Sequence, residues 1–96
     1  MRTCYLVSYD ICDPKRLARV YKAMRGFGDH LQLSVFRCEL TPAERVKLEA
    51  KIEPLIHHGE DQVLIVDIGP ADGRAQQAFA ALGLAYTHAE RHAVVI

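Results

Sequence analysis

The sequence has no apolar run near the roughly 20 residues that a membrane-spanning helix needs, and its first residues lack the layout of a signal peptide. It is also poor in cysteine. Cys4, Cys12 and Cys38 are odd in number and widely spaced, which fits neither a disulfide framework nor a zinc site. We therefore expect a cytoplasmic protein with no membrane association, whose thiols are reduced and mostly buried.

The chain has no excess of either charge, with 12 Lys and Arg against 12 Asp and Glu. The two halves differ: residues 1–37 hold seven basic and three acidic residues, a net of +4, and residues 38–96 hold five and nine, a net of −4. A neutral protein with one basic face can bind a polyanion there, so nucleic acid is not excluded. At 96 residues, the chain is expected to form a single domain, 1–96, small enough that a partner subunit is plausible.

The stretch from Tyr5 to Pro14 predicts a largely buried strand that ends in a carboxylate. Its first residues are mostly aromatic or aliphatic, and Asp10 follows where the strand should leave the sheet. Asp13 then offers an N-cap before a first-turn proline, so a helix should begin at once. A carboxylate at a rigid strand end suits a metal ion or a phosphate site. The alternative is that Asp10 is an ordinary turn residue.

The predicted helix from Pro14 to about Arg25 has one apolar stripe and one basic face. The stripe consists of Leu17, Val20, Tyr21 and Met24, at the spacing of residues that face a core. The other face carries Lys15, Arg16, Arg19, Lys22 and Arg25, and no acidic residue lies between Pro14 and Gly28. Like charges stacked on one face cost stability. The pattern therefore favours phosphate binding by Lys15, Arg16, Arg19 and Lys22, with a merely solvated face as the alternative.

The segment from His30 to Leu40 alternates in polarity and contains no Gly, Pro, Asn or Asp. On its residues alone it is one long strand, or a strand with a bulge. Ser34 and Arg37 are its candidates for chemistry, since a hydroxyl and a guanidinium can both meet a phosphate.

The second half of the chain predicts a helix, a strand and a less regular end. Thr41-Pro42-Ala43-Glu44 is a capping box with proline at the first helical position, and Pro54 should end or kink the helix. Residues 62–68 read as a strand, residues 69–73 as a loop and residues 74–82 as a possible short helix. The apolar end, within residues 92–96, should be a strand that packs on a partner subunit, which favours a dimer.

This order of elements suggests an α+β fold in which two helices cover one face of an antiparallel sheet. It is the ferredoxin-like βαββαβ plan with an extra C-terminal strand, provided that residues 30–40 form two strands. The plan does not decide the function, because it hosts nucleic-acid binders, ligand modules and enzymes.

Several motifs together resemble the CRISPR-associated Cas-two family (Cas2). They are Tyr9-Asp10-Ile11 followed by Asp13 and Arg16, then Gln32, Ser34-Val35-Phe36 and Glu39-Leu40-Thr41, with the closing Val-Val-Ile. The resemblance covers nearly the whole chain. It implies a break within residues 30–40, against the continuous strand suggested by the residues alone.

The resemblance also implies a function. Such proteins are homodimers in which the strand-end aspartate, here Asp10, reaches a divalent metal at the interface from both subunits. Members are assigned metal-dependent endonuclease activity on RNA or duplex DNA. They also form the central dimer of the complex with the Cas-one integrase (Cas1) that inserts new spacers during antiviral adaptation.

The chemistry expected from this resemblance centres on Asp10. Two facing carboxylates need a cation between them, and oxygen ligands suit Mg²⁺ or Mn²⁺. Asp10 would be the metal ligand and, with Ser34 and Arg37, would form the catalytic set. One carboxylate per subunit is sparse, so we expect weak metal binding and slow or conditional cleavage. A non-catalytic DNA-binding scaffold and a small-ligand regulatory module are the alternative functions.

Overall fold

The structure is a computed structural model that describes residues 1–84. The chain forms β1 (Thr3–Asp10), α1 (Pro14–Met24), β2 (Asp29–Gln32), β3 (Val35–Leu40), α2 (Pro42–Ile52), a 3₁₀ turn η1 (Glu53–Leu55), β4 (Gln62–Pro70) and a second 3₁₀ turn η2 (Arg74–Gln77). The predicted terminal strand, residues 92–96, lies outside the described residues.

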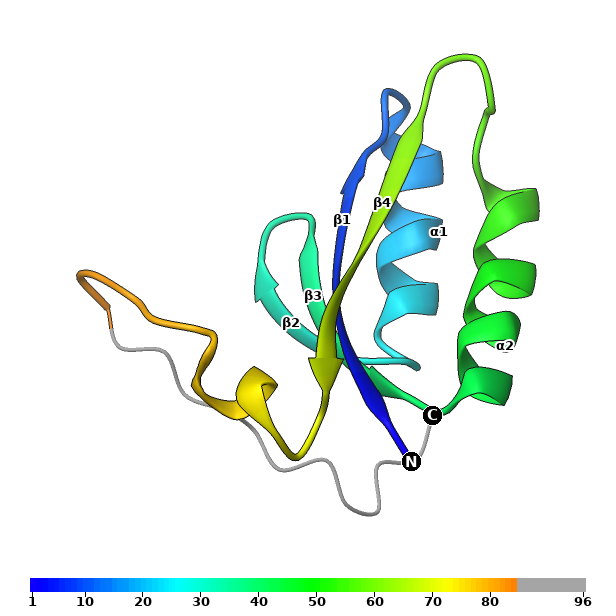
Figure 1. Cartoon of the computed structure of the whole chain (residues 1–96). Helices are drawn as coiled ribbons and strands as arrows, with labels where there is room; N and C mark the ends of the chain where they lie inside the picture. Colours follow the sequence, from blue (N-terminus) through cyan, green and yellow to red (C-terminus); the bar gives the residue numbers. More distant parts are fainter. Residues whose placement is uncertain (85–96) are drawn as a thin grey trace.

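The four strands form one antiparallel sheet in the order β2-β3-β1-β4, and both helices cover the same face of it (Figure 1). This is the predicted ferredoxin-like arrangement. β1 is central, because Thr3 to Ser8 pair with β3 while the whole strand pairs with β4. The strand that ends in Asp10 is therefore held from both sides.

The main core lies between the sheet and the helices. Val7 of β1, Phe36 of β3, Val20 and Met24 of α1, and Leu48 of α2 are almost completely buried in it. The predicted stripe of α1 is thus confirmed at Val20 and Met24, but Leu17 remains 36% exposed.

Both helix starts were predicted correctly from their caps. The Asp13 carboxylate accepts a hydrogen bond from the backbone N–H of Arg16, and Thr41 and Glu44 form the reciprocal capping box. α2 ends at Ile52, where Pro54 forces the tighter turn η1 because it cannot donate a backbone hydrogen bond.

The continuous strand over residues 30–40 was wrong, and the break implied by the family resemblance is confirmed. β2 and β3 pair as a hairpin around Leu33 and Ser34, with Leu33 88% exposed at the turn. The reason is tertiary: β3 gains a full ladder on β1, and the carbonyl of Ser34 accepts a hydrogen bond from the N–H of Tyr9.

Two further expectations for the second half need correction. β4 continues through Gly69 and Pro70, which were predicted as loop, because both pair with β1 beyond a shift in register, where Gly69 adopts a φ of 114° that suits glycine. The short helix expected over residues 74–82 is only the turn η2. Its Ala75 packs with Cys4 and Ala71 in a second, small core.

Within residues 1–84, no helix is both long and apolar enough to cross a membrane.

Candidate functional site

Asp10 is the last residue of β1, and its side chain is exposed. It pairs with Gln62, the first residue of β4, while Tyr9 beside it bonds to Ser34. The carboxylate therefore leaves the sheet from a backbone fixed by neighbours on both sides. This is the placement that the sequence predicted for a ligand or catalytic residue.

The described residues of one chain do not supply all the ligands that a metal ion needs. Carboxylate oxygens are suitable ligands for Mg²⁺ or Mn²⁺, but the described residues contain no group of three or more His, Cys, Asp or Glu side chains placed to hold a metal. Asp13 caps α1 and so has a separate role. Asp10 could contribute one carboxylate, and the remaining ligands would have to come from a second subunit, from substrate or from water.

Ser34 lies close to this strand end, whereas Arg37 does not. Arg37 is opposite Leu6, which is four residues before Asp10, or about 13 Å along the strand. Its side chain is only 1% exposed and forms a 2.6 Å ion pair with Glu39. The structure thus gives Arg37 a structural role and brings only Ser34 of the expected pair to the neighbourhood of Asp10.

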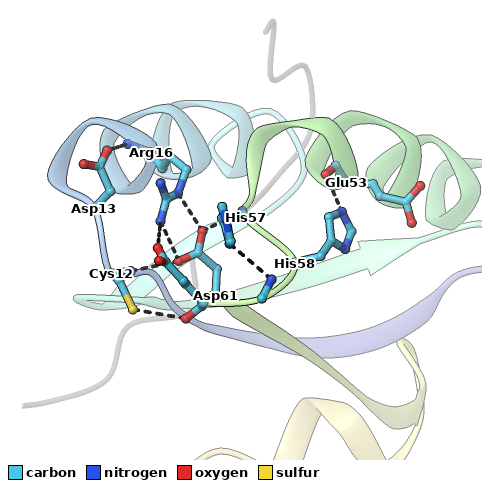
Figure 2. A network of polar contacts seen from close by, with 9 residues as sticks. Cys12, Asp13, Arg16, Glu53, His57, His58 and Asp61 are labelled. Atoms are coloured by element: carbon cyan, nitrogen blue, oxygen red, sulfur yellow. Dashed lines mark hydrogen bonds and ion pairs between the residues drawn. The ribbon is translucent and has the colours of Figure 1, made fainter.

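A cluster of polar contacts joins the start of α1 to the loop before β4 (Figure 2). The guanidinium of Arg16 donates from Nε to Asp61 at 2.8 Å and from Nη2 to the other Asp61 oxygen at 3.2 Å, and it also reaches Glu60 at 3.1 Å. Hydrogen bonding from Arg16 lowers the pKa of Asp61 below its usual range, assisted by the amides of His57 and Cys12. Asp61 in turn raises the pKa of Arg16 above its usual value.

These contacts change the expected nucleic-acid interface. Arg16 was predicted to bind phosphate, but its charge is balanced by two carboxylates of the same chain. Lys15, Arg19, Lys22 and Arg25 are exposed on α1. The basic face of this helix is therefore carried mainly by these four residues.

Beside this face, α1 and α2 enclose an open groove of about 660 Å³. Its lining includes Arg19, Lys22 and Lys51, which supply positive charge, and Phe27 and Leu55, which supply apolar surface. The groove extends the basic surface toward the second helix. The sequence alone did not indicate a role for Lys51, because the pattern of a single helix does not show which cations of a neighbouring helix lie beside it.

The comparisons with known proteins agree with this geometry. Residues 2–74 match the family model described as CRISPR associated protein Cas2. The chain belongs to the Cas2 family. It is 42% identical over its full length to the whole of a CRISPR-associated endoribonuclease Cas2 of Geobacter sulfurreducens. It is also 44% identical to one of Rhodospirillum rubrum, with 96% of this chain and 89% of that protein aligned.

Solved structures show the same Cas2 fold. Streptococcus pyogenes Cas2 superposes with a TM-score of 0.74 and 32% identity, covering 83% of this chain and 99% of the other. A hypothetical protein from Thermus thermophilus superposes with a TM-score of 0.78 and 25% identity, covering 91% and 98%. Membership in the Cas2 family favours the two nucleic-acid functions over the small-ligand module.

Sequence reasoning missed Asp61, which organises the polar cluster. It stands before a predicted strand in a loop with no recognisable motif, and two of its partners, Arg16 and Cys12, are 45 and 49 residues away along the chain. Only the pairing of β1 with β4 brings them together.

Proposed function

We propose that this protein is a CRISPR-associated endonuclease that hydrolyses phosphodiester bonds as a homodimer in the cytoplasm. RNA is the first substrate to test, because the relatives from G. sulfurreducens and R. rubrum are named endoribonucleases. The observation that carries the proposal is the exposed Asp10 carboxylate at a strand end held from both sides.

The sheet supports the dimer. Leu64 and Val66 of β4 are 51% and 44% exposed, although Val63 and Ile65, which alternate with them, pack against the main core. Leu64 and Val66 therefore lie on the face of the sheet away from the helices. Within residues 1–84 these two side chains are exposed, and exposed apolar side chains on a sheet face favour burial against a second copy of the chain.

In such a dimer, Asp10 from each subunit would hold Mg²⁺ or Mn²⁺. The bound ion would supply a more acidic water and neutralise charge on the phosphate. The chain's own contribution is to fix Asp10, and Ser34, whose carbonyl bonds to the N–H of Tyr9, can offer its hydroxyl to a phosphate oxygen. With one carboxylate per subunit, affinity for the metal should be low and cleavage slow.

The test is cleavage of labelled single-stranded RNA and duplex DNA by wild type, Asp10→Asn and a control, Asp72→Asn, with Mg²⁺, with Mn²⁺ and with chelator. Asp72 is an exposed carboxylate beyond the far end of β4, so its loss should leave the activity unchanged. The proposal requires cutting that needs the metal and is lost in Asp10→Asn alone. Equal cutting by Asp10→Asn would exclude the Asp10 mechanism.

A second function, a DNA-binding scaffold that bridges Cas1 subunits during spacer integration, is favoured by the exposed basic face of α1. The logarithm of the binding constant K falls linearly with the logarithm of the salt concentration, and each lost phosphate contact should reduce the steepness of this fall by about 0.9. The double variant Arg19→Ala/Lys22→Ala should therefore bind duplex DNA more weakly and with a visibly shallower slope.

The matched control for the scaffold is Arg45→Ala, because Arg45 is ion-paired with Glu49 on α2. It should leave the slope unchanged. An unchanged slope in Arg19→Ala/Lys22→Ala as well would exclude the basic face as the DNA site. Assembly with Cas1, measured by co-elution with and without DNA, tests the bridging role separately.

A further inference from the structure

Asp61 lies beside the strand end that carries Asp10. It directly precedes Gln62, the residue that pairs with Asp10 across β1 and β4. Its side chain is completely buried, although it belongs to a loop whose neighbours His57, His58 and Glu60 are exposed. A buried carboxylate is costly unless its oxygens are fully hydrogen-bonded, so its contacts require an explanation.

The carboxylate of Asp61 joins three segments of the chain (Figure 2). One oxygen accepts from the backbone N–H of Cys12 at 2.9 Å, in the connection between β1 and α1. The other accepts from the N–H of His57 at 2.8 Å, in the loop after η1. The two-pronged contact with Arg16 adds the first turn of α1. Charge-assisted bonds of this kind are stronger than neutral ones.

These contacts fix the backbone on both sides of Asp10. On one side, β1 is held in the sheet. On the other, Ile11 is buried and the amide of Cys12 is tied to Asp61, only two residues beyond Asp10. A catalytic group must be held within a fraction of an ångström of its productive place, and an error of about 1 Å can cost on the order of 100-fold in rate.

We propose that Asp61 and Arg16 are a positioning pair for Asp10: the buried Asp61 carboxylate, neutralised by Arg16, anchors the Cys12 amide and so sets where the Asp10 side chain leaves the strand. This inference rests on the proposed endonuclease function. Arg16 acts through Asp61 in this role and does not contact the substrate phosphate.

The experiment compares Asp61→Asn, Arg16→Gln and the double variant with wild type, using Glu49→Gln as the control. Glu49→Gln also removes one partner of an Arg–carboxylate pair, but on the exposed side of α2. The double variant leaves no buried charge without a partner, so it should fold even where Asp61→Asn does not. Thermal unfolding of each variant gives the temperature range in which all are folded.

Two readouts are taken within that range. In single-turnover cleavage of RNA with Mn²⁺, Asp61→Asn and the double variant should lose at least tenfold in the rate constant, with less than twofold change in the half-saturating RNA concentration. In amide hydrogen exchange, the peptide that covers Cys12 should lose protection, while peptides from α2 keep it. Glu49→Gln should match wild type in both.

Wild-type cleavage rates in folded Asp61→Asn and double variants would overturn the positioning role. An equal loss of protection throughout the chain would also overturn it, since Asp61 would then serve only global stability. If wild-type protein cuts no substrate, the proposed function fails by itself. Exchange at Cys12 then decides whether Asp61 anchors this strand end: retained protection in Asp61→Asn overturns the anchor, and a local loss supports it.

Discussion

Arg37 and Glu39 lie two residues apart on β3, on the face of the sheet away from the helices, and their side chains form an ion pair in which the guanidinium is almost completely buried. The guanidinium carbon also lies 5.4 Å from the centre of the Phe79 ring. β3 is thereby connected to the segment that follows β4. A charge in this position is stable only while its partners remain.

Replacing Glu39 should lower the free energy of unfolding more than replacing Arg37. Glu39→Ala removes an ion-pair partner of the buried guanidinium, and we expect a loss of about 3 kcal/mol in the free energy of unfolding. Arg37→Met removes the charge and keeps much of the volume, so it should cost less than half as much. Urea denaturation of the two variants checks the order, and the reverse order would contradict this account of the pair.

Tyr9→Phe should stabilise the protein. Within the described residues, the buried hydroxyl of Tyr9 has no hydrogen-bond partner, while its ring stacks on Phe36 with the centroids 6.2 Å apart. Removing the hydroxyl keeps the stacking and abolishes the desolvation cost, for a gain of about 1 kcal/mol in the free energy of unfolding at pH 7.

The same variant should change the alkaline limb of the stability profile. Burial raises the pKa of Tyr9 in the folded state. The stability that follows from this raised pKa is therefore fully present below the ordinary pKa near 10 and is lost as the pH rises through the folded-state value. Tyr9→Phe should therefore lose less stability between about pH 9 and pH 11 than wild type does. A drop in stability at pH 7, measured by urea denaturation, would show that the hydroxyl is bonded in solution.

Gly28→Ala should destabilise the junction between α1 and β2. An added Cβ would lie 2.5 Å from both the backbone oxygen of Arg37 and the sulfur of Cys38, and the former cannot move without disturbing β3. Overpacking of this kind costs about 1–3 kcal/mol. Gly73→Ala is the matched control, because its Cβ would meet nothing closer than 3.7 Å. Equal stability of the two variants in thermal unfolding would contradict the close approach.

Acid should destabilise the protein partly through Asp61. Its pKa is lowered in the folded state, so its stabilising contribution is present above the ordinary aspartate value near 3.8 and is lost as the pH falls toward the lower folded-state value. Glu44 acts in the same direction through its capping bond to Thr41. Below about pH 4 the stability of wild type should fall, and that of Asp61→Asn should fall less steeply. Parallel profiles from pH 5 to pH 2 would contradict the assignment.

Local sequence patterns predicted much of the fold. Asp13 and Thr41 identified both helix starts because a cap depends on residues within one turn, and Pro54 identified the end of α2 for the same reason. The break at Leu33 and Ser34 had no such signal, since the hairpin is decided by the pairing of β3 with β1. The resemblance to a family supplied what the residues themselves did not.

The candidate site divides in the same way. Asp10 was found because a strand-end carboxylate is visible in the sequence, and the basic face of α1 because its spacing is regular. That Arg16 is paired and Arg37 is buried depends on Asp61, Glu60 and Phe79, which are all at least 42 residues away in sequence. No local pattern can show which charges are already matched within the chain.

The contacts of Asp61 constrain the sequence at some positions more than at others. Cys12 and His57 meet Asp61 through their main-chain amides, which every amino acid except proline possesses, whereas Arg16 and Asp61 contribute charged side chains. At positions 12 and 57, the contact with Asp61 therefore excludes only proline. Positions 16 and 61 can change only together. A lineage of such proteins could alter the chemistry of its surface loops while the strand end beneath them stays where it is.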